Sequence, residues 1–271
     1  MPNERSSQQS NPLDPNVSVT LPLEILDKIL EQIPISNEGR RVLMACALVT
    51  TWWTGPSQRR LFSLVEVHEH NYERWMNGPV LSRSKTRLLG YVRSLRYSRV
   101  PHIGMEYQIG DLKRDPGECF SALRNLRALT LAEVTVEHVG EEGFRTRFSA
   151  FRETLTRLSL YSFDMSFSAF VALVDYFPNI TTLRLDLFEP EPDEGTVPSL
   201  SRPLRGKLHI HEVPHYRLEF HERFAELDLE YEELVISSSF FAAETEFVKS
   251  ALRISPSTVK FLRLDVEFEC K

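Results

Sequence analysis

Two closely spaced histidines are the first candidates for chemistry in this 271-residue sequence. His209 and His211 alternate on a predicted strand, so both imidazole rings would lie on one face, as two ligands of a metal ion would. A closed zinc site needs a third and a fourth ligand at fixed geometry. His215 and His221 follow in the sequence, but no cysteine is near. The simpler interpretation is a pair of solvent-facing residues, and we expect neither a metal nor another cofactor.

A run of carboxylates further along the chain is the second candidate, for acid–base catalysis or for a cation site. Its members are Glu226, Asp228, Glu230, Glu232 and Glu233. They alternate with Leu227, Leu229 and Tyr231, which is typical of the wet side of a half-buried strand. No base is paired with an obvious nucleophile, and the usual hydrolase, nucleotide-binding and zinc motifs are absent. We therefore predict that the chain is not an enzyme.

Composition narrows the class of protein further. The chain is 42% hydrophobic with a net charge of −6, so nucleic acid and anionic membranes are poor candidates as partners. It has no apolar run of the length that spans a bilayer. Residues 1–16 are polar, without the apolar segment of a secretory signal, and are predicted to be a disordered tail. Three distant cysteines fit a reducing compartment, so we expect a cytoplasmic or nuclear protein.

A spaced apolar pattern, Leu-x-x-Leu-x-Leu in its fullest form, recurs through the C-terminal two thirds of the chain. The segments are Val92-Leu95-Tyr97, Leu126-Leu129-Leu131, Leu155-Leu158-Leu160, Ile180-Leu183-Leu185, Leu208-Ile210, Leu227-Leu229 and Val259-Leu262-Leu264. Each predicts a short strand with one buried face. Helical stretches are predicted between them at 144–155, 166–177 and 239–254. Strand and helix alternating at intervals of about 25–35 residues indicate a leucine-rich-repeat-like solenoid.

The predicted fold class is therefore α/β, with an irregular solenoid that carries a curved, mainly parallel sheet. An ordinary α/β protein is the alternative, but no nucleotide-binding glycine loop follows any strand. The asparagine or cysteine ladder of regular repeats is missing from the sequence. Residues 189–203, which are rich in proline, are predicted to form a surface loop. The segment 216–236 is predicted to form a longer strand or a hairpin.

In such a solenoid, the residues between and after the last two apolar positions of each strand would form a polar concave face. The residues predicted to bind a target there are Tyr161, Arg184, Asp186, His209, His211, Asp228, Glu230 and Arg263. The acidic segment around Asp228 predicts a target that presents Lys or Arg. The alternative is that this acidity only keeps an exposed sheet soluble.

The stretch from Leu21 to Val67 predicts three short helices. Pro22 fits a helix start and Pro34 a helix end. Ser36 or Asn37 is expected to cap the second helix. The third helical piece carries two tryptophans and is expected to be interrupted at Gly55-Pro56. The predicted apolar faces are Ile25, Leu26, Ile29, Leu30 and Ile33 in the first helix, and Val42, Leu43, Cys46, Ala47 and Val49 in the second.

This stretch resembles an F-box. The resemblance rests on the order Leu-Pro-x-Glu-Ile-Leu, then Ile-Leu, then Val-x-x-Trp, then Leu-Phe, and covers about one sixth of the chain. The ending Gly55 to Phe62 resembles the F-box proteins of mushroom-forming fungi, as does the segment 216–236. An ordinary helical cap on a larger fold is the alternative. The domains expected are a tail at 1–16, an F-box at 17–70, a junction at 71–89 and a repeat domain at 90–271.

The resemblance implies a substrate receptor of a Skp–cullin–F-box ubiquitin ligase. The F-box would bind a Skp-family linker protein and through it a cullin, and the repeats would bind a target protein. The residues expected to bind the linker are Leu21, Pro22, Ile25, Ile29, Leu30, Trp52, Leu61 and Phe62. A repeat scaffold or regulatory protein that acts outside ubiquitination is the alternative.

Overall fold

The structure is a computed structural model of the whole chain, and it divides into two compact units, Met1–Ser57 and Gln58–Lys271. The residues it describes are 21–68, 71, 86–98, 120–132, 145, 148–162, 164–187, 189–191, 199–211, 224, 226–227, 229–238 and 258–266. The predicted tail at 1–16 and helix at 239–254 lie outside the described residues, as does most of 71–89. Most of the range 144–155, by contrast, is described, and instead of the predicted continuous helix it contains a 3-10 helix at Ser149–Phe151 followed by a turn.

Two helices, α1 (Leu23–Glu31) and α2 (Asn37–Val49), form most of the described N-terminal unit. Pro22 caps α1 with an extended backbone, and its carbonyl accepts hydrogen bonds from the backbone N–H groups of the next turn. Ser36 is the cap of α2, because its side chain accepts a hydrogen bond from the backbone N–H of Gly39 at 3.1 Å. The buried apolar side chains are Leu26, Leu30 and Leu43.

The third helix, α3 (Thr51–Leu61), runs without a break through Pro56. The predicted interruption at Gly55-Pro56 is therefore wrong. Proline deprives a helix of one backbone hydrogen bond, but Pro56 and Ser57 are buried, and packing outweighs a local preference of this size. The hydroxyl of Thr54 also donates to the carbonyl of Ala47 at 2.8 Å, which ties the first turns of α3 to the end of α2.

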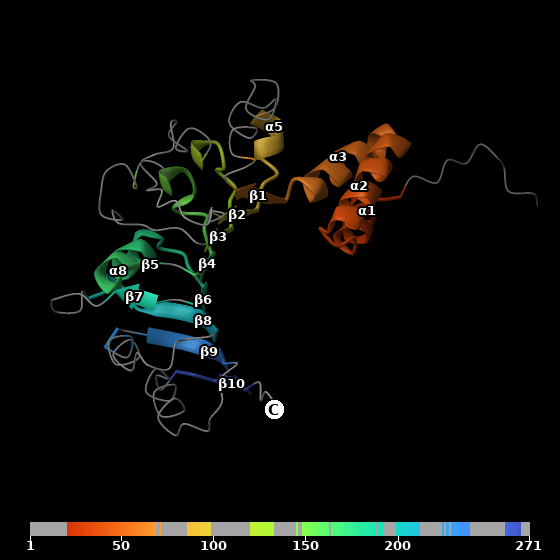
Figure 1. Cartoon of the computed structure of the whole chain (residues 1–271). Coiled ribbons are helices and arrows are strands. Elements are labelled where there is room, and N and C mark those ends of the chain that lie inside the picture. Colours follow the sequence, from red (N-terminus) through yellow and green to blue (C-terminus); the bar gives the residue numbers. More distant parts are fainter. Residues whose placement is uncertain are drawn as a thin grey trace, which may run out of the picture. The chain divides into compact units, whose positions relative to one another are not determined.

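The second unit is built on one eight-stranded sheet in which every pair of neighbouring strands is parallel. Its strands follow one another in chain order, as Figure 1 shows. They are β1 (Leu64–His68), β2 (Ser94–Ser98), β3 (Ala128–Ala132), β4 (Arg157–Tyr161), β6 (Thr182–Asp186), β8 (Leu204–His211), β9 (Leu229–Ser238) and β10 (Phe261–Val266). The predicted α/β class with a mainly parallel sheet is confirmed.

Smaller elements accompany the sheet. They are α5 (Thr86–Leu89), the 3-10 helix η3 (Ser149–Phe151), α8 (Phe167–Tyr176), and the paired short strands β5 (Asp164–Ser166) and β7 (Glu189–Glu191). The helix predicted at 166–177 is confirmed as α8, and the side chain of Ser166 caps it by accepting from the N–H of Ala169. The surface loop predicted from Glu189 instead begins with β7. No helix in the described part of the chain is long and apolar enough to cross a membrane.

The strand register places the apolar positions of the repeated pattern side by side. Leu95, Leu129, Leu158, Leu183, Leu208 and Leu234 are successive partners across the sheet, and each is almost completely buried. Phenylalanines fill the space behind them. Phe151 and Phe177 stack with ring centroids 6.1 Å apart, and Phe148 contacts Phe120 at 5.6 Å. One core therefore runs continuously from strand to strand.

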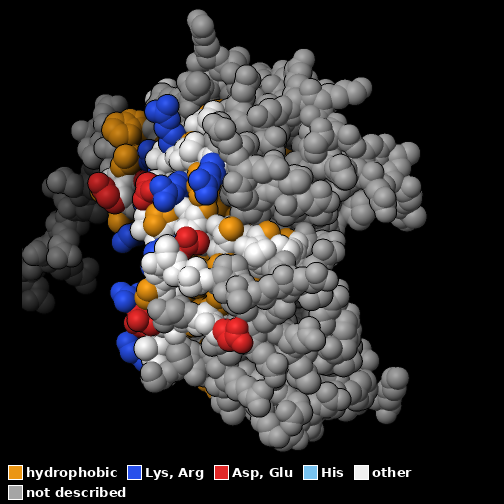
Figure 2. Space-filling view, turned by 90° about the vertical axis from the view of Figure 1, so that its left-hand side faces the viewer, with side chains coloured by type: hydrophobic (Ala, Val, Ile, Leu, Met, Phe, Trp, Pro, Cys, Tyr) orange, Lys and Arg blue, Asp and Glu red, His pale blue; other side chains and the backbone are white. Residues whose placement is uncertain are grey.

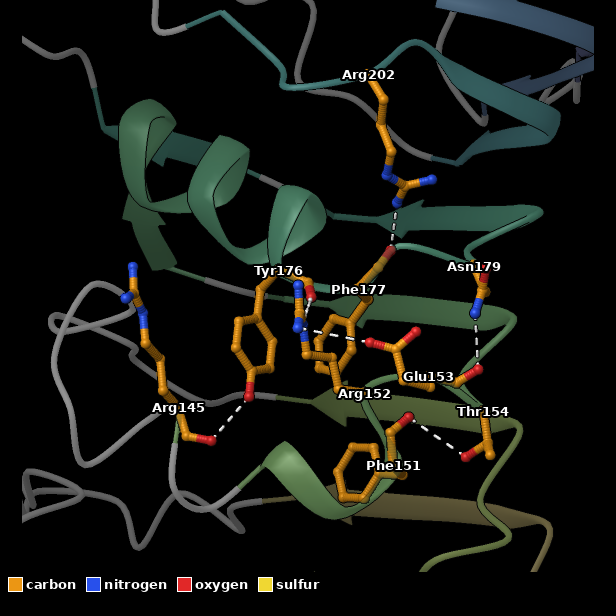
Figure 3. Close-up of polar contacts among 9 residues, drawn as sticks. All are labelled: Arg145, Phe151, Arg152, Glu153, Thr154, Tyr176, Phe177, Asn179 and Arg202. Atoms are coloured by element: carbon orange, nitrogen blue, oxygen red, sulfur yellow. Dashed lines mark hydrogen bonds and ion pairs between the residues drawn. The ribbon is translucent and has the colours of Figure 1, made fainter.

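The turns before the strands are tied together by side-chain hydrogen bonds to backbone carbonyls. Asn125 donates to Gly90 at 2.9 Å, and Thr154 donates to Leu126 at 2.8 Å. Arg152 also donates to the carbonyl of Tyr176 at 3.0 Å, and Figure 3 shows this contact at the end of α8. The sequence does not reveal this ladder, because its side chains differ in type and their acceptors are backbone carbonyls.

Two strands differ from expectation. β1 lies inside the range 17–70 that was predicted to be one helical domain, yet it pairs with β2 and belongs to the sheet. The strand predicted at Leu227-Leu229 is instead β9, which begins at Leu229 and extends to Ser238. A register shift between Gly206 and Lys207 accompanies its pairing with β8.

Candidate protein-binding surfaces

The described N-terminal helices leave many large apolar side chains exposed to solvent. Among the predicted linker-binding residues, Leu21, Ile25 and Ile29 are 43–44% exposed and Trp52 is 60% exposed. Pro22 is also exposed. Leu61 and Phe62 are half-buried and belong to the second unit. Three short helices have too small a core to bury all their apolar residues, which explains this surplus.

Leu30 differs from the other predicted contacts, because it is only 1% exposed. It packs inside the helical unit together with Leu26 and Leu43, and a partner could not reach it without opening the helices. The prediction that Leu30 contacts a linker is corrected on this ground: it supports the fold of the surface rather than forming it.

Helix α2 exposes further apolar side chains, some of which were predicted to belong to its buried face. The exposed residues are Val42, Met44, Leu48 and Val49, and Leu48 is 86% exposed. Of the predicted apolar face, Leu43 alone is fully buried. The signal was present in the sequence, since all eight residues from Val42 to Val49 are apolar and such a run surrounds a helix instead of following one stripe.

The outward face of the sheet brings most of the predicted target-binding residues into register. The central row consists of Glu66, Arg96, Thr130, Ser159, Arg184, His209, Val235 and Arg263, each the partner of the next. The adjacent row consists of His68, Ser98, Ala132, Tyr161, Asp186, His211, Ser237 and Asp265. Neighbouring strands lie about 4.8 Å apart, so these rows present side chains at fixed and short spacing.

Asp186 is the centre of a charged cluster on this face. Its side chain is only 11% exposed, and Arg184 Nε donates to one of its carboxylate oxygens at 2.7 Å. The other oxygen lies 3.1 Å from His211 Nδ1, but it accepts no hydrogen bond from a described residue. Asp186 is thus a nearly buried carboxylate with a cation on its own strand and an imidazole on the next strand. The neighbouring Tyr161 is 37% exposed and offers an aromatic ring beside it.

His209 lies between charged neighbours but forms no hydrogen bond through Nε2 with a described residue. That nitrogen is 3.9 Å from the carboxylate of Glu233. Burial lowers the pKa of His209; Glu233 opposes this effect and Arg184 adds to it. The imidazole is therefore held mainly neutral near pH 7. In the described part of the chain, no group of three or more His, Cys, Asp or Glu side chains is placed to hold a metal ion.

The acidic strand does not present the residues that were predicted. The sheet aligns Leu234 and Ile236, not Leu227 and Leu229, with the apolar residues of β8, so Val235 and Ser237 occupy the expected rows. Asp228 lies outside the described residues. Glu230 is an outward residue of β9, but it pairs with Arg205 at 2.7 Å rather than standing free.

The other acidic side chains of β9 are also paired. Glu233 forms an ion pair with Lys207, and Glu232 lies 3.3 Å from Lys260. Figure 2 shows basic and acidic side chains interspersed on the described surface of one face. The expectation of a target with a basic patch rested on free acidity, and at Glu230, Glu232 and Glu233 that acidity is compensated by ion pairs.

No protein-family model matches this chain, and no match to a curated protein reaches significance.

Proposed function

We propose that this protein is the substrate receptor of a Skp–cullin–F-box ubiquitin ligase. In this proposal the N-terminal helices are an F-box that binds a Skp-family linker, and the sheet is part of a leucine-rich-repeat-like domain that binds a target protein. The observation that carries the proposal is the set of exposed apolar side chains on α1, α2 and the start of α3, around a core that is closed without them.

The energetics favour a protein partner on these helices. Fully burying a residue such as Ile29 contributes roughly 1.5–3 kcal/mol, and contiguous exposed apolar area is unfavourable in a free soluble protein. Ile25 and Ile29 are four residues apart, so they lie one turn apart on the same face of α1. A groove in a partner could receive both side chains at once.

The sheet suits the second half of the role. Its outward side chains stand on paired strands, so a target would bind with little loss of conformational freedom in the receptor. The mechanism proposed is proximity: one chain binds linker and target, which raises the effective concentration of the target beside the ubiquitin-carrying enzyme. No catalytic group is required of this chain.

The test uses the full chain and a purified Skp-family linker protein. Ile25→Asp/Ile29→Asp should reduce linker binding at least tenfold, because two charges would have to be buried against the partner. The matched control is Phe261→Asp, which changes an apolar side chain that is 52% exposed on β10. Linker binding by the control at the wild-type level, with loss in the double variant, supports the proposal.

A fold measurement and a native experiment complete the test. Both exposed positions should tolerate the change, so an unaltered circular dichroism spectrum is expected for the double variant. Purification from the native host should recover a Skp-family linker and a cullin with the wild-type chain. Recovery of other proteins without either of these would instead support a scaffold acting outside ubiquitination.

A further inference from the structure

Arginines gather on the first strands of the sheet, in a pattern that neither the fold nor the proposed function explains. Four of them are exposed and are called here the arginine row: Arg93, Arg96, Arg127 and Arg157. Arg93 and Arg127 occupy equivalent positions before β2 and β3, and Arg157 begins β4. No sequence motif marked them, because the feature arises only when the strands align.

Backbone hydrogen bonds place Arg127 directly beside Arg93, and they place Arg157 one residue further along the next strand, where it pairs with Ala128. The N–H of Arg127 donates to the carbonyl of Arg93 at 2.8 Å, and the N–H of Arg157 donates to the carbonyl of Arg127 at 2.9 Å. With strands about 4.8 Å apart, three guanidinium groups originate within about 10 Å of one another. Arg96 lies within β2. Its neighbour Leu95 is buried, so Arg96 points to the opposite, outward face of the sheet.

The arginine row lacks the counter-charges that the rest of the sheet has. Among the described residues, no ion pair involves any of its four members, although Arg93 donates to the carbonyl of Asn125 at 3.2 Å. Glu66 is the strand partner of Arg96 but forms no ion pair with it. At β8 to β10, by contrast, each described Lys or Arg has a carboxylate partner. Like charges so close together are unfavourable unless something neutralises them.

We propose that the arginine row is the docking site for an acidic segment of a target protein. Guanidinium groups bind carboxylates through paired hydrogen bonds, and several of them within about 10 Å fit a segment that presents two or three Asp or Glu side chains on one side. The proposal rests on the proposed function only in calling that protein a target for ubiquitination. The acidic target proposed here differs from the basic target that the acidic segment around Asp228 predicted.

Net charge favours a short acidic segment over a nucleic acid. The whole chain carries −6, so a long polyanion that extends beyond the arginine row would be repelled by the rest of the surface. A short peptide interacts mainly within the screening distance of about 8–10 Å at physiological salt, which is close to the length of the row. The site is therefore sized for a few acidic residues.

The experiment measures binding of a fluorescein-labelled peptide of about ten residues, rich in Glu and Asp, to the full chain by fluorescence anisotropy. Arg127→Glu/Arg157→Glu should weaken binding at least tenfold, and Arg127→Lys/Arg157→Lys should retain more affinity than the reversal. The matched control is Arg205→Glu/Lys260→Glu, which makes the same change in net charge at side chains that are 70% and 73% exposed. The control should change affinity less than twofold.

The outcomes separate this proposal from the others. Equal loss in the reversal and the control would overturn it, since the effect would then be one of net charge alone. Absence of peptide binding by the wild type, or tighter binding of a single-stranded oligonucleotide of equal charge, would also overturn it. Linker binding by the same variants should be unchanged. A negative result with the acidic peptide would therefore overturn the docking site without affecting the proposed binding of the linker.

Discussion

The side chain of Asn179 reaches back to the turn before the preceding strand of the sheet and donates from Nδ2 to the carbonyl of Glu153 at 2.7 Å. Figure 3 shows this bond beside the end of α8. Asn125 and Thr154 form equivalent bonds at the corresponding positions of other turns. These side chains satisfy carbonyls that the strand ladder does not reach, and they hold consecutive turns at one spacing.

Replacing Asn179 tests this tie. Asn179→Ala should lower the free energy of unfolding by about 0.5–1.5 kcal/mol, the usual net contribution of a hydrogen bond. Asn179→Asp should cost more, because a carboxylate of the same shape cannot donate and would repel the carbonyl oxygen of Glu153. Urea denaturation measures both. An aspartate variant as stable as the wild type would show that the bond contributes nothing.

Tyr231 should be replaceable by phenylalanine with a gain in stability. Its side chain is 1% exposed, and its hydroxyl has no hydrogen-bond partner in the part of the chain that the structure describes. Tyr231→Phe removes that unpaired group while keeping the ring, so the free energy of unfolding should rise by about 1–3 kcal/mol. Thermal unfolding would detect the change, and a fall in the midpoint would contradict the assignment of an unpaired hydroxyl.

The same residue should affect stability at high pH. Burial raises the pKa of Tyr231 above its ordinary value of 10.0, so the unfolded chain releases this proton first. Stability should therefore fall as the pH rises above about 10, and less so in Tyr231→Phe. Denaturation curves at pH 8 and above 10 would show this, and parallel losses in both proteins would assign the effect to other groups.

Phe151 should be among the residues most sensitive to truncation. It is fully buried and stacks on Phe177. Phe151→Ala would leave a cavity and cost about 3–5 kcal/mol. The matched control is Phe261→Ala on the exposed edge strand β10, which should change stability by less than about 0.5 kcal/mol. Equal effects in the two variants would contradict the position of the core.

His209 should make the fold less stable in mild acid. Its pKa is lowered in the folded state mainly by burial, so the unfolded chain binds the proton more readily. The stability is thus complete above the ordinary pKa of 6.5 and is lost as the pH falls through that value towards the folded pKa. The difference in urea midpoint between pH 7.5 and 5.5 should be smaller in His209→Gln. An unchanged difference would exclude His209 as its source.

The sheet could be predicted from the sequence because its signal is local and repeated. In segments such as Leu158-x-Leu160, the alternation of apolar and polar residues determines which side chains face inward. Segments with the same pattern align when the strands pair. The same rule failed at β9, where Leu227-x-Leu229 and Leu234-x-Ile236 both satisfy it. Pairing with β8, which includes the irregularity at Gly206, places Leu234 and Ile236 in the inward positions. This pairing joins residues distant in sequence, so a local pattern does not predict it.

The surfaces were less predictable than the strands. Ion pairs such as Arg205 with Glu230 join residues on neighbouring strands, so acidity counted along the sequence overstated the charge that is free to bind. Leu30 and Ile29 are adjacent and chemically alike, yet one is buried and the other exposed. A periodic pattern identifies an apolar helix but does not show which of its residues the neighbouring helices cover.

The strict chain order of the parallel strands has an evolutionary consequence. In the described part of the chain, each strand of this sheet is hydrogen-bonded only to the strands that precede and follow it in the strand order. The connection from β2 to β3 is longer than that from β4 to β6, yet the register across both pairs is the same. Lengthening a connection costs little, since closure entropy grows only slowly with loop length. Insertions and deletions in the connections can therefore accumulate while the strand pairing is kept. Related chains should differ in the lengths of these connections but share the register of the sheet.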